Sequence, residues 1–462
     1  MNSPTRFFFT VALAVAAAGT GSAATHLVDS IAALKSKINS AAPGDTITLK
    51  DGVYITNGTI TVRSRGEPGQ PIVIAAESVG GVELAGTHGF NIVEPAAHIV
   101  VSGFNFTHAS GKNTIGAGTS EVRFTRNTFH CAGDGAYLSV AGDDAQIDHN
   151  EFGDKKTAGS MIAVGGTGSQ VARRLWVHHN YFHDFAALGA SGAAMIRFGL
   201  TALSLSTGAG LVEHNLFARC RGENDLVSNG SCGNTYRYNT LLDSPTAQLT
   251  LRHGHDCLVY GNIFRNTEGL RIYGDRHQIF SNYFEGNYIG INLGNGDTDV
   301  AEGAASSSHD RPDDCVIVFN TLVDNRTHYQ MSRRAPAGLG ATNTTFANNI
   351  ISGSGVAAKI EGPNSGAVWS ANLLWTTGGA GDLPAAGYTK ADPLLVAGPD
   401  GIKRPQAGSP AVESAVGNFP TVTFDLDGQP RPEKKTKGAA EPSAAPVVAQ
   451  FLSPADVGPG AK

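Results

Sequence analysis

The fold is decided by a pattern that Leu175–Phe182 (LWVHHNYF) shares with Gly210–Phe217 (GLVEHNLF). Each stretch alternates apolar and polar residues and then places an Asn directly before a pair that contains an aromatic or apolar residue. The pattern recurs with its Asn at positions 127, 150, 180, 215, 239, 262, 282, 320, 349 and 372, at spacings of 20 to 38 residues. Short strands that recur at this period, without the 3.6-residue period of a helix, are typical of the stacked coils of a solenoid.

The recurring Asn has a structural explanation in a parallel β-helix. Asn tolerates the left-handed backbone region, and its side-chain amide can hydrogen-bond to the Asn one coil above. We therefore expect these residues to form a ladder at one turn of each coil. Other repeat folds fit less well, because a propeller needs a more even repeat of about 40 residues and a leucine-rich repeat needs its own Leu pattern.

The composition agrees with this interpretation. The chain has 58 Gly and only 16% charged residues, which suits many tight turns between strands and leaves little room for long charged helices. A length of 462 residues would suggest two or three domains, but a repeat array can extend one domain. We expect a single all-β domain over residues 24–462, a right-handed parallel β-helix. The net charge of −6 does not argue against a local basic cleft.

Residues 1–23 have the features of a secretory signal peptide. Arg6 precedes an apolar run from Phe7 to Ala18, and small residues follow. The run is too short to span a bilayer, and no later stretch is apolar enough to do so. We expect a secreted or periplasmic protein with no membrane or nucleic-acid partner. The five Cys allow at most two disulfides and require none.

The two ends of the solenoid differ in composition. Residues 30–40 are predicted to form an amphipathic helix, with Asp29 or Ser30 as its N-cap and Pro43-Gly44 ending it. Such a helix would cover the unpaired edge of the first coil. Near the other end, residues 430–445 are rich in Pro, Ala, Lys and Glu, and we expect a mobile loop there.

The segment from Arg221 to Asn262 places acidic, basic and imidazole side chains on two turns of the chain, where we expect the chemistry. Glu223 and Asp225 alternate along a predicted strand, so both point to one face, where two carboxylates repel each other unless a cation neutralises them. Arg252 lies in the next coil and Arg271 in the one after. Adjacent coils are about 4.8 Å apart, so residues one repeat apart can face one ligand.

Three motifs at this spacing resemble polysaccharide lyase family 6, whose secreted β-helix enzymes include alginate lyases and chondroitinase B. The motifs are GENDLVSNGSCGNTYRYNT, LTLRHG and GLRIYGDRHQIFSNYF, and the resemblance begins at PGDTITLKDGVY after the predicted helix. It implies β-elimination at a uronic acid: the C5 proton is removed, the 4-linked sugar leaves and an unsaturated ring end remains. It also implies a Ca²⁺ held by an Asn and two acidic residues, a Lys base and an Arg in the RHG motif.

The family's residues map onto this chain with two departures. The acidic calcium ligands match Glu223 and Asp225, and the Arg matches Arg252. The family's Asn ligand matches Ser191, and its Lys, the third residue of an SNKS motif, matches Gly230. Calcium usually takes six or more oxygen ligands, so we expect a site that is depleted relative to the family.

Another group has to take the place of the missing Lys. His253 is the leading candidate base, because the unperturbed imidazole pKa near 6.5 is close to working pH. Lys156, in the loop GDKKTAG, is a weaker candidate that we place among the substrate-binding residues.

We expect arginines to bind the acidic polymer. Arg197, Arg252 or Arg271 can neutralise the substrate carboxylate, since a cation about 4 Å away contributes roughly 4 kcal/mol at an effective dielectric constant of 20. His277 lies in the same coil as Arg271, and we expect it to line the cleft as well.

The sequence therefore predicts a monomeric lyase of polyuronates, with alginate as the expected substrate and dermatan sulfate as the alternative. A second hypothesis is a non-catalytic protein that binds acidic polysaccharides and has lost the Lys. A third is a glycoside hydrolase of the polygalacturonase kind, in which Glu223 and Asp225 would form the catalytic pair. A mannuronan epimerase shares the C5 proton abstraction, but the chain has no DPHD-like signature.

Overall fold

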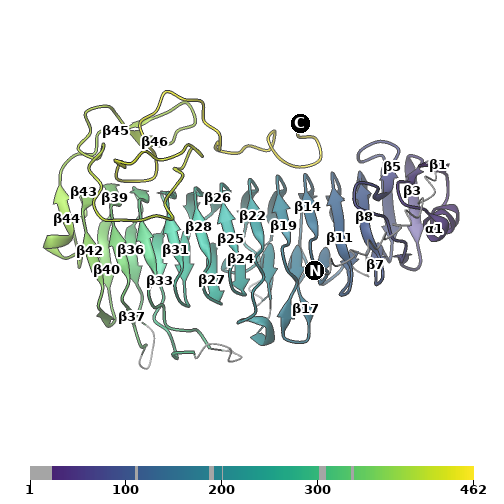
Figure 1. Cartoon of the computed structure of the whole chain (residues 1–462), viewed down its shortest axis with the longest axis horizontal. Coiled ribbons are helices and arrows are strands. Elements are labelled where there is room, and N and C mark those ends of the chain that lie inside the picture. The colour runs from purple at the N-terminus through teal and green to yellow at the C-terminus, as the bar shows by residue number, and fades with distance from the viewer. Residues whose placement is uncertain (1–22, 110–112, 187–191, 200, 301–307, 334–337) are drawn as a thin grey trace, which may run out of the picture.

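The computed structural model describes residues 23–109, 113–186, 192–199, 201–300, 308–333 and 338–462. Almost the whole predicted signal peptide lies outside these residues, and so does Ser191. The described chain is a parallel β-helix, as predicted, in which each coil adds one strand to each of three long sheets (Figure 1).

The three long sheets are named A, B and C, and their strands pair in the following order. Sheet A contains β1 (Thr25–Val28), β2 (Thr46–Leu49), β5 (Ile72–Ala76), β8 (Ala97–Ser102), β11 (Ser120–Thr125), β14 (Gln146–Asp148), β19 (Trp176–His178), β22 (Leu211–Glu213), β25 (Thr235–Arg237), β28 (Leu258–Tyr260), β31 (Gln278–Phe280), β34 (Val316–Val318), β38 (Thr345–Ala347) and β42 (Val368–Ser370). Sheet B contains β3 (Gly52–Thr56), β6 (Val82–Gly86), β9 (Phe104–Phe106), β12 (Thr128–Phe129), β15 (Glu151–Phe152), β20 (Tyr181–Phe185), β23 (Leu216–Cys220), β26 (Thr240–Ser244), β29 (Ile263–Thr267), β32 (Tyr283–Glu285), β35 (Thr321–Val323), β39 (Ile350–Gly353), β43 (Asn372–Thr376) and β44 (Tyr388–Lys390). Sheet C contains β4 (Ile60–Val62), β7 (Phe90–Ile92), β10 (Asn113–Ile115), β13 (Leu138–Val140), β16 (Ile162–Val164), β21 (Ile196–Phe198), β24 (Asp225–Gly230), β27 (Gln248–His253), β30 (Leu270–Ile272), β33 (Ile289–Leu293), β36 (Thr327–Met331) and β40 (Val356–Ile360).

The remaining elements are short. Three two-stranded sheets pair β17 (Gly166–Thr167) with β18 (Gln170–Val171), β37 (Ala341–Thr342) with β41 (Asn364–Ser365), and β45 (Leu395–Ala397) with β46 (Lys403–Pro405). Two 3₁₀ turns span Thr201–Leu203 and Ala385–Gly387.

The core runs along the inside of the coils, where the alternate apolar residues of the strands meet. Four phenylalanines of sheet B, at positions 129, 152, 182 and 217, stack face to face at centroid distances of 4.5, 4.9 and 4.8 Å. These distances match the spacing of adjacent strands, about 4.8 Å, so each coil places its ring directly on the previous one.

The predicted Asn ladder is confirmed. The Oδ1 of Asn215 accepts hydrogen bonds from the backbone N–H and the Nδ2 of Asn180, both at 3.0 Å, while Asn239 accepts the same pair of bonds from Asn215. The same arrangement links all ten residues from Asn127 to Asn372. Buried amides therefore connect the coils continuously.

The expectation that these Asn adopt the left-handed backbone region is wrong. In every coil of the ladder the residue before the Asn has the positive φ, between 51° and 66°, as at His214. The Asn side chain has to project into the interior to reach the next coil, so the change of chain direction falls on the preceding residue. Nine of these ten residues are not glycine, and each costs of order 1–3 kcal/mol that the ladder offsets.

The helix α1 (Ile31–Ser40) covers the first coil, as predicted. Ser30 is its N-cap, and its hydroxyl oxygen accepts a hydrogen bond from the backbone N–H of Ala33. Leu34 and Ile38 are fully buried against the coil. Among the described residues no helix is long and apolar enough to cross a membrane. All five cysteines are buried and unpaired.

The C-terminal segment, which includes the predicted loop 430–445, packs in part against sheet B. Figure 1 shows it running back along the helix from the last coils towards the first half of the chain. Arg431 is buried, and its guanidinium donates to the Glu441 carboxylate at 2.7 Å and to backbone carbonyls of Gly438 and Ala439. Residues 436–441 are buried, whereas 432–434 and 442–448 are exposed. Composition favoured disorder here, but a buried ion pair and the apolar surface of sheet B hold the segment.

Candidate functional site

The site lies on the outer face of sheet C, where the strand register stacks one side chain from each coil. Arg197 of β21 is level with Ser228 of β24, which is level with Thr250 of β27 and then with Arg271 of β30. At about 4.8 Å a coil, the two arginine Cα atoms lie about 14 Å apart. Arg252 is two residues beyond Thr250, on the same face of its strand.

A groove continues this face on the N-terminal side of Arg197. The corresponding residues of the preceding coils are small: Ala163, Ser139 and Thr114. They line a cavity of about 410 Å³ that reaches Arg197 and Gly192. The change from large to small side chains therefore leaves space for a ligand next to the arginines.

The two carboxylates meet beside the arginines, as predicted. Asp225 accepts a hydrogen bond from the Thr250 hydroxyl at 2.5 Å and lies 3.7 Å from the Arg252 guanidinium. Glu223, which precedes the strand, accepts the backbone N–H of Gly192 at 2.7 Å. Burial raises the pKa of Glu223, and the negative charge of Asp225 raises it further. The hydrogen bond from Gly192 and the positive charges of Arg252 and Arg197 lower it in part.

Neighbouring side chains contact Arg252 and Arg271 and restrain them. The Arg252 side chain is 43% exposed, so its guanidinium pairs with Asp225 and still faces solvent. The Arg271 guanidinium donates to the hydroxyl of Tyr273 and lies 4.8 Å from the centre of that ring. Tyr273 and Thr250 were not predicted, although each lies two positions from an arginine, on the same face of its strand, and the alternation could have identified both.

The surroundings of His253 disfavour the protonated imidazole. It is 8% exposed, its ring stacks against His309 at 5.7 Å, and its Nδ1 is buried without a hydrogen-bond partner. Burial lowers its pKa to about 4, and the charge of Arg252 acts in the same direction. The imidazole is therefore neutral at neutral pH and can accept a proton, but as a weaker base than an exposed histidine.

Gly230 occupies a tight position in the register between β24 and β27. The pairing shifts between Asn229 and Gly230, so that Gly230 lies opposite His253. A Cβ built at Gly230 would lie 2.7 Å from the backbone oxygen of Phe198, closer than real Cβ contacts. The backbone has thus closed over the place where the family pattern has a Lys.

The sequence also matches a family model. The model for chondroitinase B matches residues 28–338, which is well over half of the chain. The chain belongs to the chondroitinase B family. No curated protein sequence matches this family member.

Solved structures share its fold. The PL6 family alginate lyase AlyGC has 24% sequence identity and a TM-score of 0.73 over 92% of this chain. A mannuronic acid specific family 6 lyase from human gut microbiota has 23% identity and a TM-score of 0.69, covering 80% of this chain and 91% of its own. A PL6 alginate lyase solved with a trisaccharide has 19% identity and a TM-score of 0.70, covering 95% and 96%. This family member spans only 58–59% of the length of AlyGC.

The described residues do not fit the calcium ion that the family resemblance implies. Of the four carboxylate oxygens of Glu223 and Asp225, one accepts from Gly192, one from Thr250, and one faces Arg252. Calcium takes six to eight oxygen ligands, and a guanidinium 3.7 Å from one carboxylate already supplies positive charge there. In this family member Asp225 thus pairs with Arg252, and Glu223 accepts the backbone N–H of Gly192.

Two further predicted residues, His277 and Lys156, are not among those that line the groove. His277 is fully buried: its Nδ1 accepts the backbone N–H of Cys257 and its Nε2 lies 2.8 Å from the Tyr273 carbonyl. The prediction that it contacts substrate is wrong, because the turn folds its ring inward to satisfy two backbone groups. Lys156 is exposed on the loop between β15 and β16. Its neighbour Lys155 is buried and donates to the Gly135 carbonyl.

Proposed function

We propose that the chain is a secreted polysaccharide lyase that cleaves alginate by β-elimination. One observation carries the proposal: three arginines, Arg197, Arg252 and Arg271, project from neighbouring coils onto one face beside a groove of about 410 Å³. Such an array suits a polymer with a carboxylate on each sugar. The alginate lyases among the structural neighbours support the choice of substrate.

In the proposed reaction the arginines first neutralise the carboxylate of the substrate. A uronate carboxylate bound near Arg197 or Arg252 loses part of its negative charge, which makes the C5 proton more acidic. At an effective dielectric constant of 20, each cation about 4 Å away contributes roughly 4 kcal/mol. No step requires calcium, because the acidic side chains are already paired with Arg252 and hydrogen-bond donors.

The proton transfer is assigned to His253. Its Nδ1 is neutral but buried, so it has to become accessible before it accepts the C5 proton; the C5–H electrons then form a C4–C5 double bond, and the C4–O bond breaks. The departing oxygen carries the electron pair and is stabilised by Arg252 until water protonates it. His253 is the described imidazole nearest to Arg252 in sequence, and its Nδ1 has no hydrogen-bond partner.

The test follows the ultraviolet absorbance of the unsaturated product. The chain from Ala24 is incubated with alginate or with dermatan sulfate, with and without EDTA. Arg252→Ala should lower kcat/KM by about 10²–10³-fold, and His253→Ala by about 10²–10⁴-fold. Arg63→Ala, which removes an exposed arginine that donates to the Glu94 carbonyl, is the matched control and should be unchanged. Product from dermatan sulfate alone would refute alginate, and full activity in Arg252→Ala would refute the site.

A second candidate is a protein that binds acidic polysaccharides without cleaving them. The closed backbone at Gly230 favours it, since a positioned base is typically worth 10²–10⁴-fold in rate. Binding of alginate that is weakened by Arg252→Ala, together with no unsaturated product, would establish this candidate. Secretion is tested separately, by sequencing the N-terminus of the exported protein, which we expect to begin at Ala24.

A further inference from the structure

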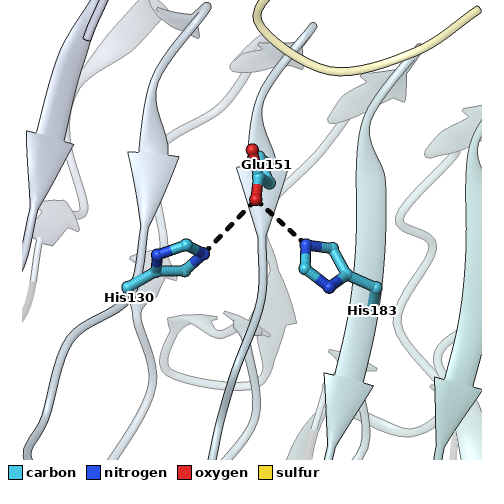
Figure 2. Close-up of side chains that lie close together, drawn as sticks. All are labelled: His130, Glu151 and His183. Carbon is cyan, nitrogen blue, oxygen red and sulfur yellow. Dashed lines mark hydrogen bonds and ion pairs between the residues drawn. The ribbon is translucent and has the colours of Figure 1, made fainter. Parts of the chain in front are cut away.

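Three ionisable side chains converge on the outer face of sheet B, apart from the arginine site on sheet C. His130 follows β12, Glu151 begins β15 and His183 lies in β20, so the three come from consecutive coils. Figure 2 shows the two imidazoles pointing at the carboxylate from either side. The Oε1 of Glu151 lies 3.4 Å from the Nε2 of His130 and 3.0 Å from the Nε2 of His183.

A glycine makes this convergence sterically possible. Phe129, Phe152 and Phe182 are level in the register, so the next residues, His130, Gly153 and His183, form one column. A Cβ at Gly153 would lie 2.5 Å from His183 Nε2 and 3.0 Å from His130 Nε2. Because Gly153 has no side chain, the middle coil leaves space between the two histidines, and the Nε2 atoms of both imidazoles lie in that space.

A second layer of contacts fixes His183. Its Nδ1 lies 2.7 Å from the Asp184 carboxylate, which in turn accepts two hydrogen bonds from Arg219. A carboxylate that accepts from Nδ1 leaves Nε2 as the ligand atom, and this carboxylate–histidine pair is the usual support of a metal-binding imidazole. The Tyr181 ring stacks on His183 at 4.2 Å and restrains its orientation.

The distances suit a tetrahedral ion. Zinc bonds to His nitrogen and carboxylate oxygen are about 2.0–2.1 Å, which places neighbouring ligand atoms about 3.3 Å apart. The separations of Glu151 Oε1 from the two imidazole nitrogens, 3.0 and 3.4 Å, bracket that value, and all three ligand atoms lie within 4.8 Å of one another. The side chains of His130 and Glu151 are about 30% exposed, whereas the Nε2 atom of His130 is itself buried.

We propose that His130, Glu151 and His183 bind a divalent transition-metal ion, of which Zn²⁺ is the best fit, and that the ion links three consecutive coils. Two histidines with one carboxylate are a common zinc ligand set with an open fourth position. The site lies on a different sheet from the arginines, and it does not depend on the proposed lyase activity.

Without a metal, a proton has to hold the cluster together. Burial lowers the pKa of His183, but its hydrogen bonds to Glu151 and Asp184 outweigh this, so the pKa is raised. The metal ion takes the place of this proton. Metal binding should therefore release protons, and affinity should fall as the pH is lowered.

The test titrates the metal-free chain from Ala24 with Zn²⁺ and with Co²⁺, using calorimetry and the visible absorption of tetrahedral cobalt. The wild type should show that spectrum and a higher Tm with metal. Glu151→Gln and His183→Ala should lose the spectrum, and Asp184→Asn, which leaves all three ligands in place, should weaken binding about 10–100-fold. His149→Ala is the matched control, because His149 stacks on His179 in a separate group of histidines.

Folding is checked apart from binding. Glu151→Gln has nearly the shape of the native side chain, so its Tm without metal should stay close to that of the wild type. A wild type without a tetrahedral cobalt spectrum would overturn the proposal. The same conclusion would follow if Co²⁺ bound equally well to a folded His130→Ala/His183→Ala variant, or if only His149→Ala lost binding.

Discussion

Removing one rung of the Asn ladder should destabilise the whole β-helix, and Asn215 is the clearest position for this test. Its Oδ1 accepts the backbone N–H of Asn180, and its Nδ2 donates to the carbonyls of Val177 and Glu213 and to Asn239. Asn215→Ala leaves the buried Asn180 N–H without a partner and removes a donor from two buried carbonyls. An unsatisfied buried group costs about 1–3 kcal/mol, and carbonyls with a second partner cost less.

We therefore expect a loss of about 3–5 kcal/mol in the free energy of unfolding, which is large against the 5–15 kcal/mol that is usual for a domain. Equilibrium unfolding in urea measures this loss, and hydrogen exchange at the Asn180 amide locates it. Asn215→Asp retains the acceptor oxygen. At neutral pH it should cost less stability than Asn215→Ala only if the charge of the buried carboxylate is neutralised. The exposed Asn57→Ala is the control. A loss below about 1 kcal/mol in Asn215→Ala, equal to that control, would refute the view that the ladder holds the coils together.

Three other predictions concern the site, the pH dependence and the C-terminal segment. Gly230→Lys should not restore a catalytic base but should destabilise the fold by about 1–3 kcal/mol, because its Cβ would lie 2.7 Å from the Phe198 oxygen; higher activity at an unchanged Tm would contradict this. Burial lowers the pKa of His277 to about 4, so the unfolded chain binds more protons than the native one between pH 6.5 and 4. Stability should fall by up to about 3 kcal/mol from this residue as the pH drops through that window, and a urea series that is flat there would exclude it. Arg431→Met leaves Glu441 buried without its cation and should cost about 3–5 kcal/mol, seen as faster proteolysis of the C-terminal segment; unchanged cleavage would mean that the ion pair does not hold it.

The sequence by itself determined the architecture, because the information for a solenoid is repeated in every coil. An Asn such as Asn239 hydrogen-bonds to an Asn in the coil before and to another in the coil after. An Asn that recurs along the sequence is therefore enough to predict the ladder. The cap on the first coil was equally local, since Ser30 and the apolar residues of α1 lie within a few turns of each other. The meeting of Glu223, Asp225 and Arg252 followed from coil spacing and from the family resemblance.

Only the tertiary structure decided which residues become neighbours across coils and which way each turn points. Coil lengths vary, so the sequence does not give the register that sets His130, Gly153 and His183 in one column. The same uncertainty hid the inward fold of His277, whose ring satisfies backbone groups rather than a ligand. Repetition along the chain specifies that coils stack, whereas the chemistry of this protein depends on single side chains whose positions are fixed by packing between coils.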